Sequence, residues 1–270
     1  MISRPDKRLI YDVGAHKGED TEFYLKMGFD VVAIEPMAEL FESLSTRFVK
    51  EVADGRLTLL NVAVSDRSGA QQFFASEKSD WGTMIPEWAA RNEQFGVRNR
   101  RVTVQTERFE TILEKHGIPY YLKIDIEGSD LLCLKALRPF AAKPKFVSLE
   151  SNKVSFRGLL DEFELMRLLG YDRFKIINQQ RVPLQTAPIP FDFQPGSSGL
   201  FGADLPGQWH SAVNAIARYI PIFARYKFFG DNTSGARLVR RAAPIVPTAL
   251  RLLPPWYDTH ATRMDHDESG

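Results

Sequence analysis

A strand, a glycine turn and a helix follow one another near the N-terminus, and this stretch constrains the fold most. In residues 10–21 (IYDVGAHKGEDT) an apolar strand runs into Gly14, the turn closes at Gly18, and a helical pattern begins near Asp20. Such a turn brings main-chain N–H groups to the carboxyl edge of a sheet, where open α/β sheets bind ligands. The spacing Gly14-x3-Gly18 is not the dinucleotide pattern G-x-G-x-x-G, and no Gly-Lys-Ser/Thr follows. The turn therefore favours neither NAD nor a nucleoside triphosphate.

Strand-like and helix-like segments alternate along the first two thirds of the chain. Apolar strands are predicted at residues 9–13, 30–34, 56–64, 101–105, 120–124, 145–149 and 174–177. Between most of them, hydrophobic residues recur at three- and four-residue spacing, as in amphipathic helices. The pattern predicts the α/β class, with a doubly wound, mostly parallel seven-stranded sheet and right-handed crossovers. Residues 71–74 resemble the return arm of a hairpin after the third strand.

The pattern changes after residue 180, which divides the chain into three predicted parts. Residues 1–180 form the ligand-binding core. Residues 181–207 are rich in proline and glycine, which indicates a lid or linker and leaves room for the last sheet strand. Residues 208–270 form a basic helical extension, because seven of the eight charged residues between Pro206 and Trp256 are basic. This basic patch suits an anionic acceptor or peripheral contact with an anionic membrane, and a solvated helix face is the equal alternative.

Composition limits the class of protein further. The 270 residues carry a formal net charge of +1, which gives no support for a nucleic-acid partner. Cys133 is the single cysteine and lies among leucines, so we expect a buried thiol and no multi-cysteine zinc site. We find neither a signal-peptide pattern nor an apolar window of about 18 residues. These features predict a soluble, cytoplasmic protein.

Acidic residues stand at the ends of several predicted strands, which converge on one crevice in a parallel sheet. They are Asp12, Glu35, Asp125, Glu127 and Glu150. Glu35 follows the second strand, 21 residues after Gly14, where a carboxylate suits the two hydroxyls of a ribose. Ribose recognition without a pyrophosphate turn favours a nucleoside. S-adenosylmethionine fits this reading, with its ribose on Glu35 and its amino-acid end at the glycine turn.

Five strings occur in a fixed order over about residues 8–180: IYDVGAHKGEDT, AIEP, NVAVSD, YLKIDIEGSD and SLES. They resemble the FkbM-type family of S-adenosylmethionine-dependent O-methyltransferases, and KIDIEG with the opening turn is the most specific part. The resemblance implies a class I methyltransferase fold with strand order 3-2-1-4-5-7-6 and an antiparallel last strand. It also implies methylation of a hydroxyl, often on a sugar of a glycan, glycolipid or glycosylated metabolite. The family usually has Asn where this chain has His16.

The resemblance and the strand ends together define the predicted cofactor contacts. These are Asp12, Gly14, Ala15, His16, Gly18, Thr21, Glu35, Pro36, Ala63 and Asp125. Lys123, in the strand before Asp125, is interpreted as an ion-pair partner.

Methyl transfer to a hydroxyl requires alignment and a group that takes the hydroxyl proton. Asp125 and Glu127 are the predicted catalytic pair. Together with Glu150 they offer the oxygen ligands of a Mg²⁺ ion, but a metal-free site is favoured because no histidine is fixed nearby. Trp81 is the predicted platform for a sugar face, and His210 is a second candidate acceptor contact.

Two other functions remain open on the sequence alone. One is a non-catalytic nucleoside- or glycan-binding module on the same fold. The other is an NAD-dependent oxidoreductase, which the missing G-x-G disfavours. The sequence leaves the oligomeric state and the identity of the acceptor open.

Overall fold

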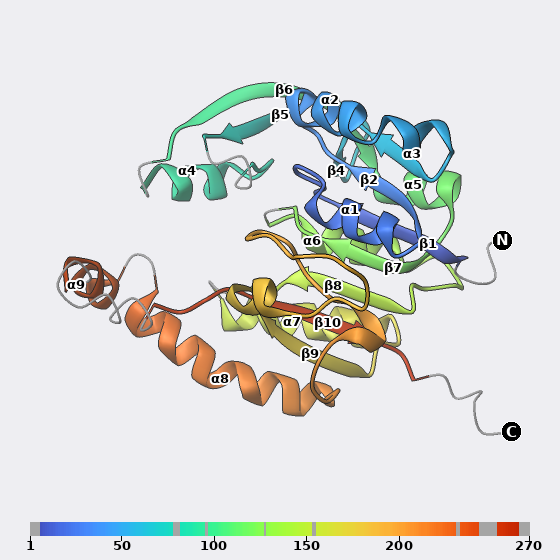
Figure 1. Ribbon diagram of the computed structural model, residues 1–270. Helices are drawn as coiled ribbons and strands as arrows, with labels where there is room; N and C mark the ends of the chain where they lie inside the picture. Colours follow the sequence, from blue (N-terminus) through green and yellow to red (C-terminus); the bar gives the residue numbers. More distant parts are fainter. Residues whose placement is uncertain are drawn as a thin grey trace, which may run out of the picture. The chain divides into compact units, whose positions relative to one another are not determined.

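A sheet of seven strands organises the protein, in the order β3-β2-β1-β7-β8-β10-β9 (Figure 1). The computed structural model describes residues 6–77, 82–94, 97–126, 128–152, 155–230, 233–242 and 253–264. The strands of this sheet are β1 (Asp6–Val13), β2 (Asp30–Ile34), β3 (Leu57–Leu60), β7 (Pro119–Ile124), β8 (Phe146–Glu150), β9 (Arg173–Asn178) and β10 (Tyr257–Thr262). In sequence order this is 3-2-1-4-5-7-6, and β10 runs antiparallel to β9. The predicted α/β class, strand order and antiparallel last strand are confirmed.

A second, three-stranded sheet has the order β4-β6-β5. Its strands are β4 (Ala63–Ser65), β5 (Gly69–Ser76) and β6 (Asn99–Arg108). The prediction of one strand over residues 56–64 is therefore wrong, because the chain leaves the large sheet after β3. Asn61 marks the exit, since its side-chain amide donates to the carbonyls of Glu35 (2.9 Å) and Pro36 (3.2 Å).

The second sheet corrects two further predictions. Residues 101–105 lie in β6 and not in the large sheet, where β10 takes the seventh place. Residues 71–74 lie in β5 and pair with β6, which itself runs parallel to β4. The hairpin with the preceding strand is thus wrong, because a later segment inserts between its two arms.

Nine helices are seen among the described residues. They are α1 (Glu19–Lys26), α2 (Ala38–Arg47), α3 (Val49–Ala53), α4 (Pro86–Gln94), α5 (Phe109–His116), α6 (Asp130–Ala136), α7 (Phe156–Leu168), α8 (Ala212–Phe229) and α9 (Ser234–Ala242). Two short 3₁₀ helices, η2 (Gln179–Leu184) and η3 (Gly202–Asp204), flank an irregular segment. Of the helices that the structure describes, none is both long and apolar enough to span a membrane.

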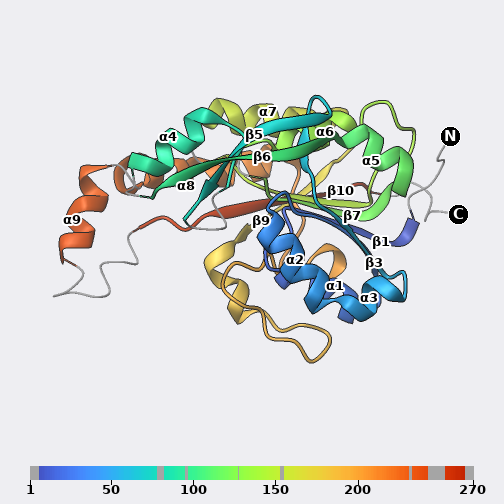
Figure 2. The same cartoon turned by 90° about the horizontal axis from the view of Figure 1, so that it is seen from above.

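The chain divides into two units, and the first comprises Met1–Leu149 and Val182–Leu205. In Figure 2 its helices α1, α2 and α3 lie on one side of the strands, whereas α5 and α6 lie on the other. The consecutive apolar residues Leu9, Ile10 and Tyr11 of β1 are all buried, because both faces of the strand are covered. This arrangement leaves the carboxyl ends of the strands as the place where polar side chains can meet a ligand.

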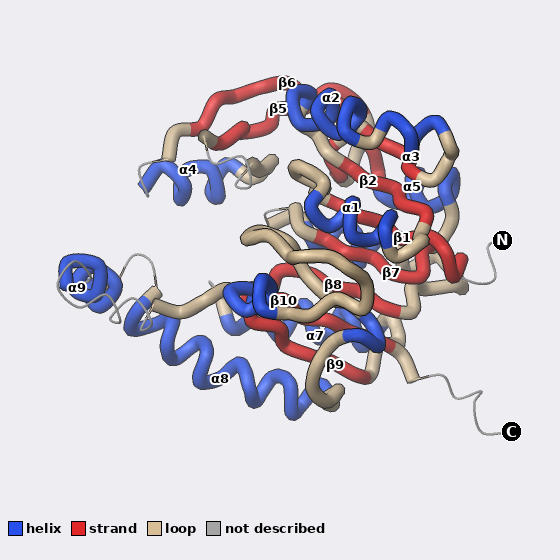
Figure 3. The backbone as a smooth tube through the Cα atoms, viewed as in Figure 1, coloured by secondary structure: helices blue, strands red, loops and turns tan. Residues whose placement is uncertain are grey.

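Residues 182–205, which we call the strap, belong to the first unit. Figure 3 shows the backbone with helices, strands and loops distinguished by colour. Phe201 stacks on Tyr121 with the ring centroids 4.3 Å apart, and Phe193 packs on Phe23 at 4.8 Å. The whole strap is described and contains no strand. The last sheet strand is therefore not in the proline- and glycine-rich segment. It is β10, within the C-terminal extension, which holds α8 and α9 as well.

The second unit comprises Glu150–Arg181 and Pro206–Gly270. Three buried hydroxyls tie its parts together: those of Ser151, Tyr219 on α8 and Thr259 on β10. Thr259 Oγ1 lies 2.8 Å from each of the other two, and the Ser151 and Tyr219 hydroxyls are also hydrogen-bonded. Because every buried hydroxyl in this cluster has partners within it, the cluster fixes α8 against β10 without unpaired polar groups.

Candidate cofactor site

The glycine turn after β1 is shaped by close contact with the neighbouring strand. Gly14 has a φ of +85°, and a Cβ built there would lie 1.9 Å from the carbonyl oxygen of Asp125. The N–H groups of Gly14 and Ala15 both donate to the carbonyl of Ile34 (3.0 Å each). Only glycine permits this approach, and these two N–H groups serve the protein's own structure.

Gly18 closes the turn at the N-terminal cap of α1. It has a φ of +80°, and a Cβ there would meet the side chains of Leu44 and Phe48 at 2.7 Å. His16 also has a positive φ, +49°, and its Nδ1 lies 3.4 Å from Glu19 Oε1. The turn is thus held in a left-handed conformation at three positions, with the His16 side chain directed to Glu19.

Glu35 is a buried carboxyl held at both of its oxygens. Oε2 accepts the main-chain N–H of His16 and Oε1 accepts that of Met37, both at 2.9 Å, and the residue is 6% exposed. Burial raises the pKa of Glu35 to about 7, although the two N–H donors oppose the shift. Each carboxylate oxygen has acceptor capacity beyond one hydrogen bond. The ionised group can therefore accept two ribose hydroxyls, so it fits the nucleoside part of S-adenosylmethionine.

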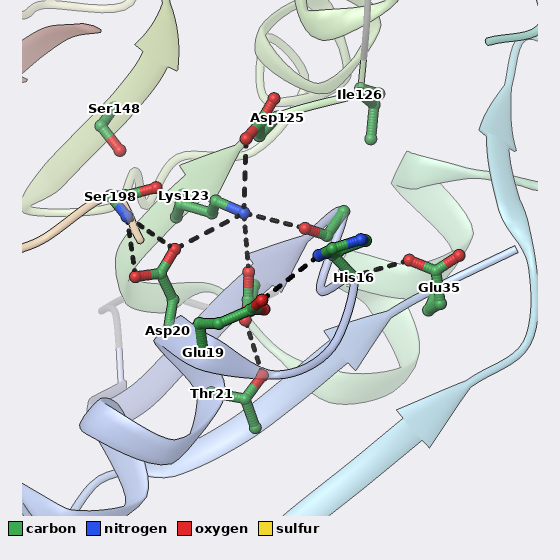
Figure 4. A network of polar contacts seen from close by, with 12 residues as sticks. His16, Glu19, Asp20, Thr21, Glu35, Lys123, Asp125, Ile126, Ser148 and Ser198 are labelled. Carbon is green, nitrogen blue, oxygen red and sulfur yellow. Dashed lines mark hydrogen bonds and ion pairs between the residues drawn. The ribbon is translucent and has the colours of Figure 1, made fainter. Parts of the chain in front are cut away.

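Lys123 lies at the centre of a buried charge cluster (Figure 4). Its ammonium nitrogen is 2.8 Å from the carbonyl oxygen of Gly14. It is also 3.1 Å from Asp12 Oδ1, 3.8 Å from Asp20 Oδ2 and 3.9 Å from Asp125 Oδ2. Burial lowers the pKa of Lys123, but the three carboxylates outweigh it and raise the pKa well above its ordinary value. The predicted ion-pair role of Lys123 is confirmed, and the residue holds the turn and two strand ends together.

Asp12 and Thr21 lie beneath the turn with no exposed surface. The Thr21 hydroxyl donates to Asp12 Oδ2 at 2.6 Å, while Lys123 occupies the other oxygen. Asp12 thus supports the turn indirectly, through Lys123, which donates to the carbonyl of Gly14. Ala15 is buried and Pro36 partly buried at the same strand ends.

Asp20 joins the strap to this cluster. The main-chain N–H of Ser198 donates to both carboxylate oxygens of Asp20, at 2.9 and 3.0 Å. Burial raises the pKa of Asp20 to about 7, opposed by the charge of Lys123. Asp20, Ser198 and Asn61 were not predicted from the sequence. An acidic residue in the first turn of α1 was the available signal for Asp20, whereas the contact with Ser198 spans 178 residues.

Asp125 is the carboxylate of the cluster that reaches solvent. Its side chain is 45% exposed, against 0% for Asp12 and 5% for Asp20. Ala63, predicted to contact the cofactor, is buried at the start of β4 in an apolar cluster with Phe73, and Met37 packs against this cluster. Of the three carboxylates around Lys123, Asp125 is thus the one exposed enough to contact another molecule, and it is also the one predicted to be catalytic.

Glu127 and Trp81 lie outside the described residues, so their predicted roles stay predictions. The Asp130 carboxylate accepts the N–H groups of Ile126 (3.3 Å) and Gly128 (3.2 Å). Gly128 has a φ of +92°, and a Cβ there would lie 2.8 Å from the indole ring of Trp88. Among the described residues, Trp88 of α4 is therefore an aromatic side chain that lies against Gly128.

Glu150 and His210 belong to the second unit. His210 exchanges two main-chain hydrogen bonds of 2.8 Å with Phe174 of β9, and its side chain lines a pocket of that unit. Across the described ranges, His, Cys, Asp and Glu side chains form no group of three or more that could hold a metal ion.

Residues 12–173 match the methyltransferase FkbM domain family. A probable ribosomal RNA small subunit methyltransferase A from Methanospirillum hungatei is 43% identical over 53 residues, which are 20% of this chain and 21% of that protein. The chain thus aligns with about a fifth of the length of this curated relative.

Two methyltransferases are among the solved structures that align with the chain. Precorrin-6y C5,15-methyltransferase from Geobacter metallireducens is 12% identical, with a TM-score of 0.40 over 96% of this chain and 82% of that one. A SAM-dependent methyltransferase from Thiobacillus denitrificans, in complex with S-adenosylhomocysteine, is 10% identical, with a TM-score of 0.36 over 97% and 88% of the two chains.

Family membership rests on the domain match, which covers more than half of the chain. The glycine turn, Glu35 and Asp125 all lie inside it. The chain therefore belongs to the FkbM family of S-adenosylmethionine-dependent, class I methyltransferases.

Proposed function

We propose that this protein is an S-adenosylmethionine-dependent O-methyltransferase that acts on a hydroxyl of a sugar, in a glycan, glycolipid or glycosylated metabolite. The observation that carries the proposal is Glu35, a buried carboxyl with two fixed N–H donors and further acceptor capacity, beside the glycine turn. S-adenosylmethionine, when bound, supplies a methyl group activated by its sulfonium. The chain's own residues then have to bind and orient the cofactor and the acceptor, and to remove the proton of the acceptor hydroxyl.

Different residues of the site bind the cofactor and remove the proton. Glu35 accepts the ribose hydroxyls, and the turn from Gly14 to Gly18 receives the amino-acid end. Asp125 takes the proton of the acceptor hydroxyl, because it is the exposed member of the Lys123 cluster. Lys123 and Asp12 position the turn and do not touch the acceptor. Trp88 offers an aromatic face beside the turn that follows Asp125, which suits the apolar face of a sugar ring.

Binding and transfer can be tested separately. Calorimetry with S-adenosylhomocysteine and with NAD tests the cofactor, and we expect binding of the first only. Glu35→Ala should weaken this binding by about tenfold or more, the loss expected when hydrogen bonds to a charged group are removed. Tight binding of NAD alone would overturn the proposal.

Transfer is tested by comparing glycans and small metabolites from cells with and without the gene by mass spectrometry. We expect a product heavier by one methylene unit only where the gene is present. Asp125→Asn keeps the shape of the side chain and should reduce transfer about a hundredfold or more, with a much smaller effect on S-adenosylhomocysteine binding. Wild-type protein that binds the cofactor product but methylates no acceptor would favour the binding-module alternative.

A further inference from the structure

A basic pocket of about 590 Å³ lies entirely within the second unit. It is lined by residues of β9, β10, α8 and the segment before α8, and three of them are basic: Lys175, His210 and Arg218. The described residues that line it include no carboxylate. Its volume is in the usual range for a small-molecule site.

Two of the three basic residues are held in place: Lys175 by its side chain and His210 by its main chain. Lys175 is 4% exposed, and its ammonium lies 4.6 Å from the ring centroid of Trp209. His210 is held by its pair of main-chain hydrogen bonds with Phe174. Asp258 of β10 stands opposite Ile177, but it is buried and does not line the pocket. The buried Lys175 side chain is ordered before any ligand arrives, so it loses little side-chain entropy on binding, whereas Arg218 is exposed and has to be ordered by the ligand.

The positive charges act on one another. The pKa of His210 is lowered, first by burial and then by the charges of Arg218 and Lys175. The pKa of Lys175 is lowered by burial. Each of these effects disfavours a positive charge in the pocket, and a nearby anion would favour the charged forms and so oppose the shifts.

We propose that this pocket binds a phosphorylated sugar through its phosphate monoester group. A guanidinium matches the oxygens of a phosphate bidentately, and an ammonium adds a point charge, so Arg218 and Lys175 suit a dianion better than a single carboxylate. Pro221 and Ile222 of α8 and Tyr257 of β10 supply the apolar wall on which the sugar ring packs. This binding goes beyond methyl transfer and needs no methyl donor.

Calorimetry of the full chain tests the proposal without S-adenosylmethionine. We expect saturable binding of glucose 6-phosphate, weaker binding of glucuronate, and no heat with glucose. Arg218→Gln should weaken glucose 6-phosphate binding about tenfold or more, equivalent to about 1.4 kcal/mol. The matched control is Lys227→Gln, an exposed cation of the same helix outside the pocket, which should change affinity less than about twofold. In NMR spectra, the imidazole resonances of His210, assigned by their absence in His210→Gln, should change chemical shift when glucose 6-phosphate is added.

Several results would overturn the proposal. Equal weakening by Arg218→Gln and Lys227→Gln would mean a diffuse charge effect, and an unchanged His210 signal would place the ligand elsewhere. Binding only to vesicles containing phosphatidic acid would assign the phosphate monoester to a lipid surface instead of a soluble sugar. Because no methyl donor is present, failure here leaves the methyl-transfer proposal untouched.

Discussion

Glu35 can change its charge near neutral pH, because burial raises its pKa to about 7. Only the ionised carboxylate has its full capacity to accept ribose hydroxyls, so a protonated Glu35 must lose its proton before the cofactor binds. We predict that the affinity for S-adenosylhomocysteine rises about tenfold per pH unit below pH 7 and levels off above it. Calorimetry from pH 6 to 8 measures this slope, which should vanish in Glu35→Gln. If the variant kept the slope, Asp20, whose pKa is also raised to about 7, would be the titrating group.

Lys123 compensates the charge of buried carboxylates. Lys123→Met would leave Asp12 and Asp20 without their cation, and breaking a buried ion pair in this way costs about 3–5 kcal/mol of the free energy of unfolding. The matched control is Lys26→Met. Lys26 pairs with Glu22 at 2.7 Å on the surface, with the side chains 50% and 29% exposed, and its loss should cost less than about 1 kcal/mol. Urea denaturation measures the free energy of unfolding of both variants, and equal losses would contradict a central role for Lys123.

At the scale of the elements, the approach of β7 to the end of β1 depends on one missing side chain. Gly14→Ala would place a methyl group 1.9 Å from the carbonyl oxygen of Asp125, so β1 and β7 must separate there. Gly28→Ala is the control, because Gly28 has a similar φ of +89° but no atom within 4 Å of its Cβ position. Both variants bear the left-handed penalty of about 1–2 kcal/mol.

We predict that Gly14→Ala costs clearly more unfolding free energy than Gly28→Ala and also abolishes S-adenosylhomocysteine binding. Urea denaturation and calorimetry of the two variants give the comparison. Similar stabilities would mean that the turn relaxes without disturbing the strands, and the steric argument would then fail.

The sequence predicted those elements whose cause is local. Residues 30–34 form β2 with the predicted bounds, because a β-branched run ends at Glu35-Pro36. The sequence did not predict that the third strand breaks at Asn61, since the amide finds its acceptors 25 and 26 residues earlier. It also missed β10, whose short, mixed sequence YDTHAT becomes a strand only by pairing with β9. Tertiary pairing decides such segments.

The site divides in the same way. Gly14, Glu35 and Asp125 stand at strand ends that the alternation of the sequence locates. The burial of Asp12 and the contact between Asp20 and Ser198 depend on how distant segments pack, which periodicity does not encode. The contact of Trp88, the proposed aromatic platform, is likewise tertiary, because Trp88 lies against Gly128 only through the placement of α4.

For the whole molecule, His260 links stability to pH. It lies on β10 opposite Lys175, 2% exposed, and burial, aided by the charge of Lys175, lowers its pKa to about 3. In the unfolded chain a histidine has a pKa of about 6.5, so between pH 6.5 and 3 the unfolded state binds a proton that the folded state does not. The free energy of unfolding must therefore fall as the pH falls through this window.

We predict that, when the pH is lowered from 7 to 5, His260 decreases the free energy of unfolding of the wild-type protein by about 2 kcal/mol. This follows from about 1.4 kcal/mol per pH unit below pH 6.5. Urea denaturation of wild type and His260→Gln at both pH values isolates this contribution, because all other titrating groups are common to the two proteins. Parallel pH dependence of the two proteins would assign the effect to another group.

The position of β10 also has a consequence for synthesis on the ribosome. β9 ends at Asn178, but its antiparallel partner begins only at Tyr257. At about 5–20 residues per second, translation of the intervening chain takes on the order of ten seconds. During that time the hydrogen-bonding edge of β9 that β10 will cover is open to other nascent chains. A pause or a truncation between these two strands would therefore prolong the exposure of an aggregation-prone edge, and molecular chaperones would be needed most at that stage of translation.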